Sequence, residues 1–114
     1  MEFTFPAVMV RVVDGDTLVC SLDLGLRVCM TARCRLLDVD APELTRPGEY
    51  ERATAAKVFV ESLCPSGQVG RFVSRTLDKY GRPLGHYYLP DGRNLSTLLV
   101  EAGHSKTSPR AVIS

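Results

Sequence analysis

The sequence predicts a small α+β domain that is rich in β-structure, with five strands and two helices in the order βββαββα. Two observations carry this prediction. Short apolar and β-branched runs recur between turn-forming Asp, Gly and Pro residues. Two other segments have apolar residues at helical spacing and are bounded by residues that typically start or stop a helix.

The first three strands are expected as consecutive antiparallel neighbours in the first third of the chain. Residues 8–13 and 17–22 are apolar and β-branched, and the Asp and Gly residues of 14–16 separate them. A third such run spans 27–39, after the turn signal at 23–25. These three runs therefore predict a meander of three strands.

A helix, two further strands and a short second helix are expected to follow. The first helix is predicted over 49–63, and the two strands over 68–75 and 84–89. Asn94 can cap the second helix, and Gly103 can end it. Many short strands with two helices fit a small closed barrel of the OB type.

Length and composition indicate one soluble globular domain. The chain has 114 residues, which suits a single domain, here expected over 1–104 with a flexible tail over 105–114. No apolar run approaches the roughly 18 to 20 residues of a membrane span, so no membrane partner is expected. The N-terminus lacks the features of a signal peptide, which predicts a cytoplasmic protein. The formal charge of +1 predicts weak binding of a polyanion, or binding at a local basic patch.

The four cysteines have no spacing typical of a metal site, which disfavours a cysteine-based metal or redox protein. If Leu24 and Gly25 form a two-residue hairpin tip, Cys20 would face Cys29 and a cross-strand disulfide would be possible. Without a secretory signal, reduced thiols are favoured instead. The two histidines belong to no motif and are expected to have structural or surface roles.

Carboxylates and arginines recur where strands should end. They lie in three short runs, residues 13–17, 34–43 and 78–82. Asp16 and Asp40 supply hard anionic oxygens suited to Ca2+ or Mg2+. Arg35 and Arg82 supply planar forks that match phosphate oxygens and can stabilise charge developing on a phosphoryl group. Glu43 remains as a candidate base, so the set suits metal-assisted cleavage of a phosphodiester.

The order D-G-D-T, R-L-L-x-V-D-A-P-E and D-K-Y-G-R resembles the staphylococcal nuclease (thermonuclease) family over about residues 8–103. The resemblance implies an OB-type barrel and a Ca2+-dependent nuclease. It implies that Asp16 and Asp40 are carboxylate ligands of Ca2+ and that Ala41 is a ligand through its backbone carbonyl. Few protein ligands would mean loose metal binding.

The resemblance also implies roles for the residues around the scissile phosphate. Arg35 and Arg82 would clamp that phosphate, and Glu43 would act as the general base or position the attacking water. Lys79 and Tyr80 would contact a neighbouring phosphate. The chain is therefore interpreted as a Ca2+-dependent endonuclease of low sequence specificity that acts on DNA, with RNA as a further candidate substrate. The alternative is a non-catalytic OB module that binds nucleic acid or protein.

Three further polar residues of these runs, Asp14, Thr17 and Asp38, are not predicted to bind the metal or the phosphate directly. Asp14 is expected to orient a ligand water or to form an Asx turn, and Thr17 to lie beside the ligands; alone, both would suit an ordinary turn. Alternation puts Arg35 and Asp40 on opposite faces, so the third strand must bend, bulge or end between them. Asp38 is expected to face solvent.

Overall fold

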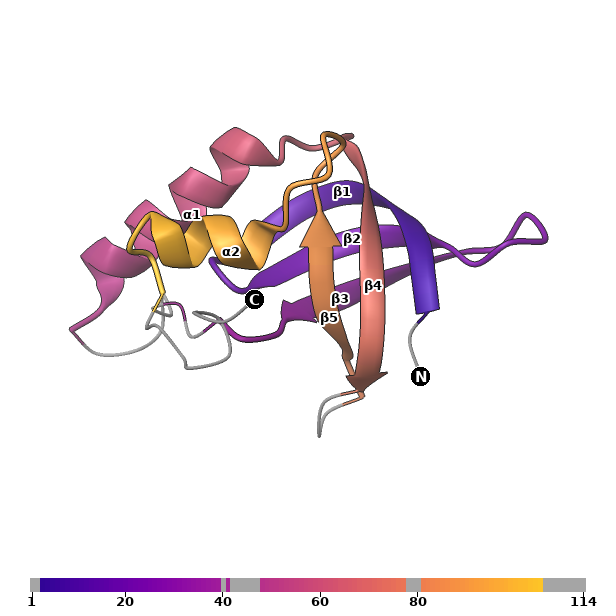
Figure 1. Ribbon diagram of the computed structural model, residues 1–114, viewed down its shortest axis with the longest axis horizontal. Helices are drawn as coiled ribbons and strands as arrows, with labels where there is room; N and C mark the ends of the chain where they lie inside the picture. The colour runs from indigo at the N-terminus through magenta and orange to yellow at the C-terminus, as the bar shows by residue number, and fades with distance from the viewer. Residues whose placement is uncertain (1–2, 40, 42–47, 78–80, 106–114) are drawn as a thin grey trace.

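The computed structural model describes residues 3–39, 41, 48–77 and 81–105, which form a closed five-stranded barrel with two helices (Figure 1). The strands are β1 (Phe3–Asp14), β2 (Thr17–Asp23), β3 (Cys29–Leu36), β4 (Val69–Leu77) and β5 (Pro83–Tyr88). The helices are α1 (Tyr50–Leu63) and α2 (Leu95–Glu101). This architecture confirms the predicted β-rich α+β fold of the OB type.

The barrel closes because β1 pairs with two partners and β3 meets β5. Around the barrel the order is β1, β2, β3, β5, β4. β1 is antiparallel to both β2 and β4, and register irregularities in its pairing with β2 accompany its curved path in Figure 1. β3 and β5 run parallel over a short stretch, where Arg35 lies beside Leu84 and Leu36 beside Gly85. That short contact places the end of β3 beside the start of β5.

The core follows from alternation along the strands, which the register irregularities interrupt in β1. Side chains that point into the barrel are almost fully buried, among them Met9, Leu18, Leu22, Leu36, Phe72 and Tyr87. α1 covers the barrel with Ala53, Ala56 and Val60, and α2 with Leu95 and Leu99. A Cβ on Gly85 would overlap the carbonyl oxygen of Val73, so β5 can approach β4 only because this position is glycine.

The third strand is shorter than predicted. It ends at Leu36 instead of continuing to residue 39, and Leu37 and Asp38 form a turn. Asp38 has φ 61°, in the left-handed region that costs most residues energy but that Asp tolerates better than most. The expectation that the strand bends, bulges or ends after Arg35 is therefore confirmed.

The β2–β3 hairpin differs from the predicted one. Leu24 N–H donates to Val28 O at 2.8 Å, so the loop is longer than two residues. Cys20 lies opposite Ala32 and Cys29 opposite Asp23, so the predicted pairing of Cys20 with Cys29 is wrong. The hairpin projects beyond the barrel at the right of Figure 1.

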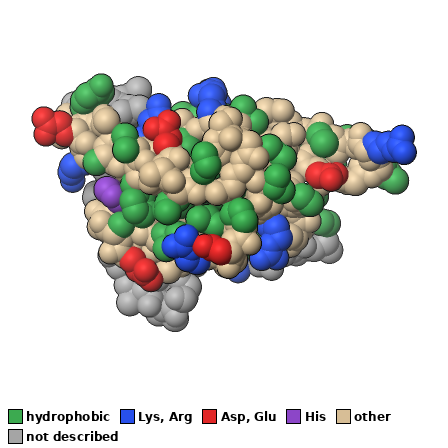
Figure 2. Space-filling model, turned by 90° about the horizontal axis from the view of Figure 1, so that it is seen from above, with side chains coloured by type: hydrophobic (Ala, Val, Ile, Leu, Met, Phe, Trp, Pro, Cys, Tyr) green, Lys and Arg blue, Asp and Glu red, His purple; other side chains and the backbone are tan. Residues whose placement is uncertain are grey.

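Two surface properties bear on what the chain can bind. Figure 2 shows charged side chains of both signs interspersed over the visible face, without a large block of one sign. In the described part of the chain, neither helix has the length and apolar character needed to cross a membrane. Because the net charge is only +1, strong attraction for a polyanion would have to come from the local placement of charged groups.

Candidate active site

Asp16 lies in the tight connection between β1 and β2, and its carboxylate is almost completely enclosed. The side chain is 1% exposed. The Thr17 hydroxyl donates to Asp16 Oδ1 at 3.1 Å, and the backbone N–H of Leu36 donates to Asp16 O at 2.9 Å. The first bond fixes the carboxylate, and the second ties this connection to the end of β3.

Arg35 supplies the positive charge beside this carboxylate. It lies opposite Thr17 in the β2–β3 pair, which brings Arg35 Nη2 to 3.4 Å from Asp16 Oδ2. Burying a carboxylate is costly unless an opposite charge compensates it, and Arg35 provides part of that compensation. Because the Arg35 side chain is still 29% exposed, it can also reach a ligand from solvent.

Gly15 brings the chain that follows β3 against the Asp16 turn. A Cβ built on Gly15 would lie 2.9 Å from Ala56 Cβ of α1 and 3.0 Å from Ala41 Cβ. Ala41 is fully buried. The three residues are therefore in close contact, and Ala41 lies beside the turn that carries Asp16, as a shared metal site requires.

Asp14 and Arg82 lie at the edges of this arrangement. Asp14 ends β1 opposite Thr17 and is half-buried. Arg82 directly precedes β5 and is also half-buried. Arg82 lies two residues before Leu84, and Leu84 is the neighbour of Arg35. The start of β5 therefore brings Arg82 near the edge of the barrel that carries Arg35.

The structure thus brings together Asp16, Thr17, Arg35 and Ala41, with Asp14 and Arg82 next to them. The other predicted site residues, Asp40, Glu43, Lys79 and Tyr80, lie outside the described residues. Within the described ranges, no three His, Cys, Asp or Glu side chains converge as a metal site would require. A cation site here would accordingly depend on Asp40 as well as Asp16.

The donors that are described suit a hard divalent cation. Asp16 offers a carboxylate oxygen and Ala41 a backbone carbonyl oxygen, both of the type that Ca2+ prefers. The enclosed Asp16 carboxylate has one arginine 3.4 Å away, and a divalent cation would add to that compensation. These residues therefore fit the Ca2+ that the family resemblance implies.

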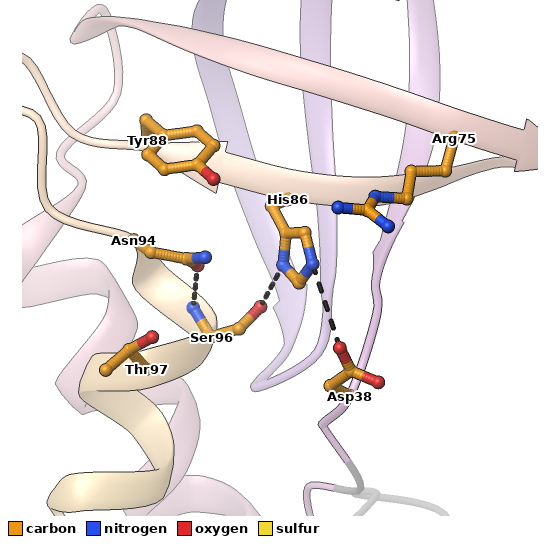
Figure 3. Close-up of a pocket in the computed structure, with 7 residues that line it drawn as sticks. All are labelled: Asp38, Arg75, His86, Tyr88, Asn94, Ser96 and Thr97. Atoms are coloured by element: carbon orange, nitrogen blue, oxygen red, sulfur yellow. Dashed lines mark hydrogen bonds and ion pairs between the residues drawn. The ribbon is translucent and has the colours of Figure 1, made fainter. Parts of the chain in front are cut away.

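A second group of polar residues was not predicted from the sequence. Asp38, His86 and Ser96 line one pocket, shown in Figure 3. His86 is half-buried on β5, and the Asp38 carboxylate, 25% exposed, points toward its ring. Asp38 was expected to face solvent, and the structure shows it partly exposed with its carboxylate also facing His86. The sequence signal was the alternation along β5, which puts residue 86 on the same side as residues 84 and 88.

The buried cysteines take no part in either site. Burial raises the pKa of Cys64 to about 12. The pKa of Cys20 is raised by the hydrogen bond that its thiol donates to Cys34 and then by burial. Burial likewise raises the pKa of Tyr87, whose hydroxyl donates to Gln68 Oε1 at 2.7 Å. Because thiolates are the reactive and metal-binding form, these thiols are inert at neutral pH.

Comparison with known proteins agrees with this geometry. The sequence model of the family described as "Staphylococcal nuclease homologue" matches residues 33–111. Two curated relatives, from Escherichia coli O157:H7 and Escherichia coli, are each named "Uncharacterized endonuclease" and are each 37% identical over 98 residues. The alignment covers 83% of this chain and 56% of each relative, so the chain spans about half the length of these relatives.

Proposed function

The chain belongs to the staphylococcal nuclease family, and we propose that it is a Ca2+-dependent endonuclease of low sequence specificity. Its substrate is DNA, with RNA as a further candidate. The observation that carries the proposal is the enclosed Asp16 carboxylate with the half-exposed Arg35 guanidinium 3.4 Å away. This pair combines a cation ligand and a phosphate ligand at one edge of the barrel, and the endonuclease names of the relatives support the same activity.

The arginines hold the scissile phosphate in this proposal. A guanidinium donates two parallel hydrogen bonds to phosphate oxygens and remains charged at any physiological pH. Arg35 acts from β3 and Arg82 from the residue just before β5, so they approach the phosphate from two sides. Their main effect is on charge that grows on the phosphoryl oxygens during the reaction.

Asp16, Asp40 and the carbonyl of Ala41 would hold Ca2+. When bound, the cation supplies positive charge that stabilises the phosphoryl oxygens. Thr17 keeps the Asp16 carboxylate in one orientation through its hydrogen bond to Oδ1. Asp14, at the end of β1, is close enough in the chain to orient a ligand water.

The water that attacks phosphorus needs a base, and Glu43 has that role in the proposal. A glutamate of ordinary pKa, about 4.3, is ionised at neutral pH and can accept a proton from water. Lys79 and Tyr80 contact a neighbouring phosphate of the same strand. These three assignments rest on the family resemblance of the two motifs that contain them.

A cleavage assay tests this function directly. Single-stranded DNA, duplex DNA and RNA are each incubated with the protein in Ca2+, in Mg2+ and in chelator. We expect cleavage in Ca2+ that chelator abolishes. Undiminished cleavage by the metal-free protein would contradict the metal requirement, and binding without cleavage in any metal would favour the non-catalytic OB module.

Single substitutions then separate the roles. Glu43→Gln should lower turnover by about 100- to 10,000-fold, and Arg82→Ala by about 100- to 1,000-fold. Arg27→Gln is the matched control, because it removes an arginine from the tip of the β2–β3 hairpin, at the opposite end of β3 from Arg35. Turnover of Glu43→Gln and Arg82→Ala within about threefold of the wild type would show that both assignments are wrong.

A further inference from the structure

The pocket in Figure 3 lies where three parts of the barrel meet. His86 and Tyr88 come from β5, Arg75 from β4, and Asp38 from the turn after β3. Asn94, Ser96 and Thr97 come from the start of α2 and the residue before it. The cavity has a volume of about 260 Å³, just below the range of roughly 300 to 1,000 Å³ that holds drug-sized ligands. Its size therefore suits a small planar group.

The polar groups in this pocket are held in fixed positions. Ser96 is 4% exposed, and its backbone N–H donates to Asn94 Oδ1 at 2.9 Å. Its hydroxyl lies 3.1 Å from His86 Nδ1, which holds the imidazole ring. His86 Nε2 is 3.9 Å from Asp38 Oδ2, too far for a direct hydrogen bond. The ring is thus anchored on one side and directed into the cavity on the other.

This arrangement does not have the geometry of a serine nucleophile with its base. In a Ser-His-Asp triad the serine lies at Nε2 of the histidine and the carboxylate at Nδ1. Here the two are exchanged, and the Ser96 hydroxyl is enclosed. The group therefore lacks the geometry for nucleophilic catalysis by Ser96, which leaves ligand binding as the role to be considered.

The mixture of charges indicates the chemistry of that ligand. Arg75 and Asp38 face one cavity, and the Asp38 carboxylate would repel a phosphate there. A nucleobase carries both donors and acceptors on its edges, so it can use an acidic and a basic side chain at once. Tyr88 adds an aromatic ring, and the Arg71 guanidinium lies 5.6 Å from its centroid. Aromatic and arginine planes are typical partners of unstacked bases.

The position of the pocket connects it to the phosphate clamp. Leu84, His86 and Tyr88 share one side of β5, and Leu84 is the neighbour of Arg35. Two residues of strand place Leu84 and His86 about 7 Å apart along β5, and Arg82 directly precedes that strand. We propose that this pocket binds one unstacked base of the nucleic acid strand whose phosphate Arg35 and Arg82 hold. The inference rests on the proposed function for its substrate class.

Binding of short single strands tests the proposal without cleavage. The affinity of the protein is measured by fluorescence anisotropy in chelator, with ten-nucleotide strands of each base and with an abasic strand that has the same phosphates. The wild type should bind its preferred strand about 5- to 100-fold more tightly than the abasic strand. Equal affinity for the abasic strand and all four base strands would overturn the proposal.

Two conservative substitutions locate the effect. Asp38→Asn and Thr97→Val should each reduce the advantage of the preferred strand, by about 2- to 12-fold, and leave the abasic strand unchanged or more tightly bound. Asp91→Asn in the turn after β5 and Thr54→Val on α1 are the matched controls outside the pocket. If Asp38→Asn instead strengthens binding of every strand equally, the cavity holds a phosphate and the proposal is wrong.

The two histidines provide a direct reading of occupancy. His86 lies in the pocket, and His104 packs against Phe59 with ring centroids 4.7 Å apart and the rings tilted by 38°. NMR signals of the His86 ring should shift when the preferred strand is added, and those of His104 should not. Cleavage in Ca2+ without a base-dependent shift of the His86 signals would refute base binding in the pocket but leave the nuclease assignment in place. A base-dependent shift without cleavage in any metal would overturn the nuclease assignment and support the pocket.

Discussion

Replacing Gly15 with alanine perturbs the fold and the candidate active site at the same point. The new Cβ would lie 2.9 Å from Ala56 Cβ and 3.0 Å from Ala41 Cβ. Carbon atoms pack at about 3.5 to 4.0 Å, so both contacts must open by roughly 0.5 to 1 Å. Overpacking of this kind typically costs about 1 to 3 kcal/mol, which corresponds to a Tm lower by roughly 5 to 15 °C for a domain of this size.

The same shift should weaken cation binding. Calcium ligands lie at about 2.3 to 2.6 Å from the ion. Moving Ala41 relative to Asp16 by about half an ångström would therefore disturb the distances of the proposed ligands to the ion. We therefore expect Gly15→Ala to need more Ca2+ for half-maximal cleavage than the wild type. Thermal unfolding in chelator measures the first effect, and a Ca2+ titration of cleavage measures the second.

A compensating substitution makes the steric explanation testable. Ala56→Gly removes one of the two atoms that the new Cβ would strike, although on its own it costs about 1 kcal/mol of helix stability. Ala55→Gly, at an exposed position of α1, lowers helix stability by the same amount but removes no atom near the new Cβ. Gly15→Ala should therefore be less destabilising in the Ala56→Gly background than in the Ala55→Gly background. Equal losses in both backgrounds, or a Tm within about 1 °C of the wild type for Gly15→Ala alone, would refute the close packing.

Three further outcomes follow from the buried groups. Arg35→Ala should lower the Tm more in chelator than in Ca2+, because it removes a positive charge beside Asp16 that bound cation can partly replace; equal losses would contradict the shared site. Ellman's reagent should modify the exposed Cys29 in the native protein and the buried thiols only after unfolding. Since the pKa of the Cys64 thiol rises from 9.0 unfolded to about 12 folded, stability should be full below about pH 9 and fall as pH rises toward 12. Urea unfolding at several pH values should show that the free energy of unfolding falls less steeply above pH 9 for Cys64→Ala than for the wild type. An identical pH dependence in the two proteins would contradict this role of Cys64.

The elements that the sequence predicted well are those with strong local signals. Asp14, Gly15 and Asp16 separate two apolar runs, and the structure turns there between β1 and β2. The first strand was predicted to start at residue 8, but β1 starts at Phe3. Pro6 lies in this added part, and proline is unusual inside a strand because it has no backbone N–H to donate. In the barrel, Pro6 lies opposite Arg71 of β4, a partner far away in the sequence. Long-range pairing of this kind overrides the local signal.

The predicted register of the β2–β3 hairpin was wrong because local sequence signals do not define the loop at its tip. The expected tip at Leu24 and Gly25 followed from the turn signal at 23–25, but Leu26 and Arg27 also adopt positive φ, with values of 54° and 63°. Neither residue type signals that conformation. The longer loop shifts the pairing, so that Cys20 lies opposite Ala32.

The described residues of the candidate active site could be predicted from sequence motifs, whereas the residues of the pocket could not. Asp16 and Arg35 each stand in a recognisable run of residues, and the structure places them 3.4 Å apart. Asp38, His86 and Ser96 come from three separate elements and belong to no motif. They meet only because β5 lies beside β3 and α2 folds back toward β5. Such a cluster follows from topology, which local patterns do not encode.

The register of β3 is therefore what connects the fold to the proposed chemistry. Cys34 and Leu36 point into the barrel and are fully buried, while Arg35 between them points outward to Asp16. A slip of one residue would turn Arg35 into the apolar core and remove the positive charge from beside the enclosed carboxylate. Both consequences are costly, so burial of the core side chains and pairing at the candidate site select the same register. In the proposed function, this coupling lets a chain with a net charge of only +1 bind phosphate, because the barrel fixes Asp16 and Arg35 at one edge.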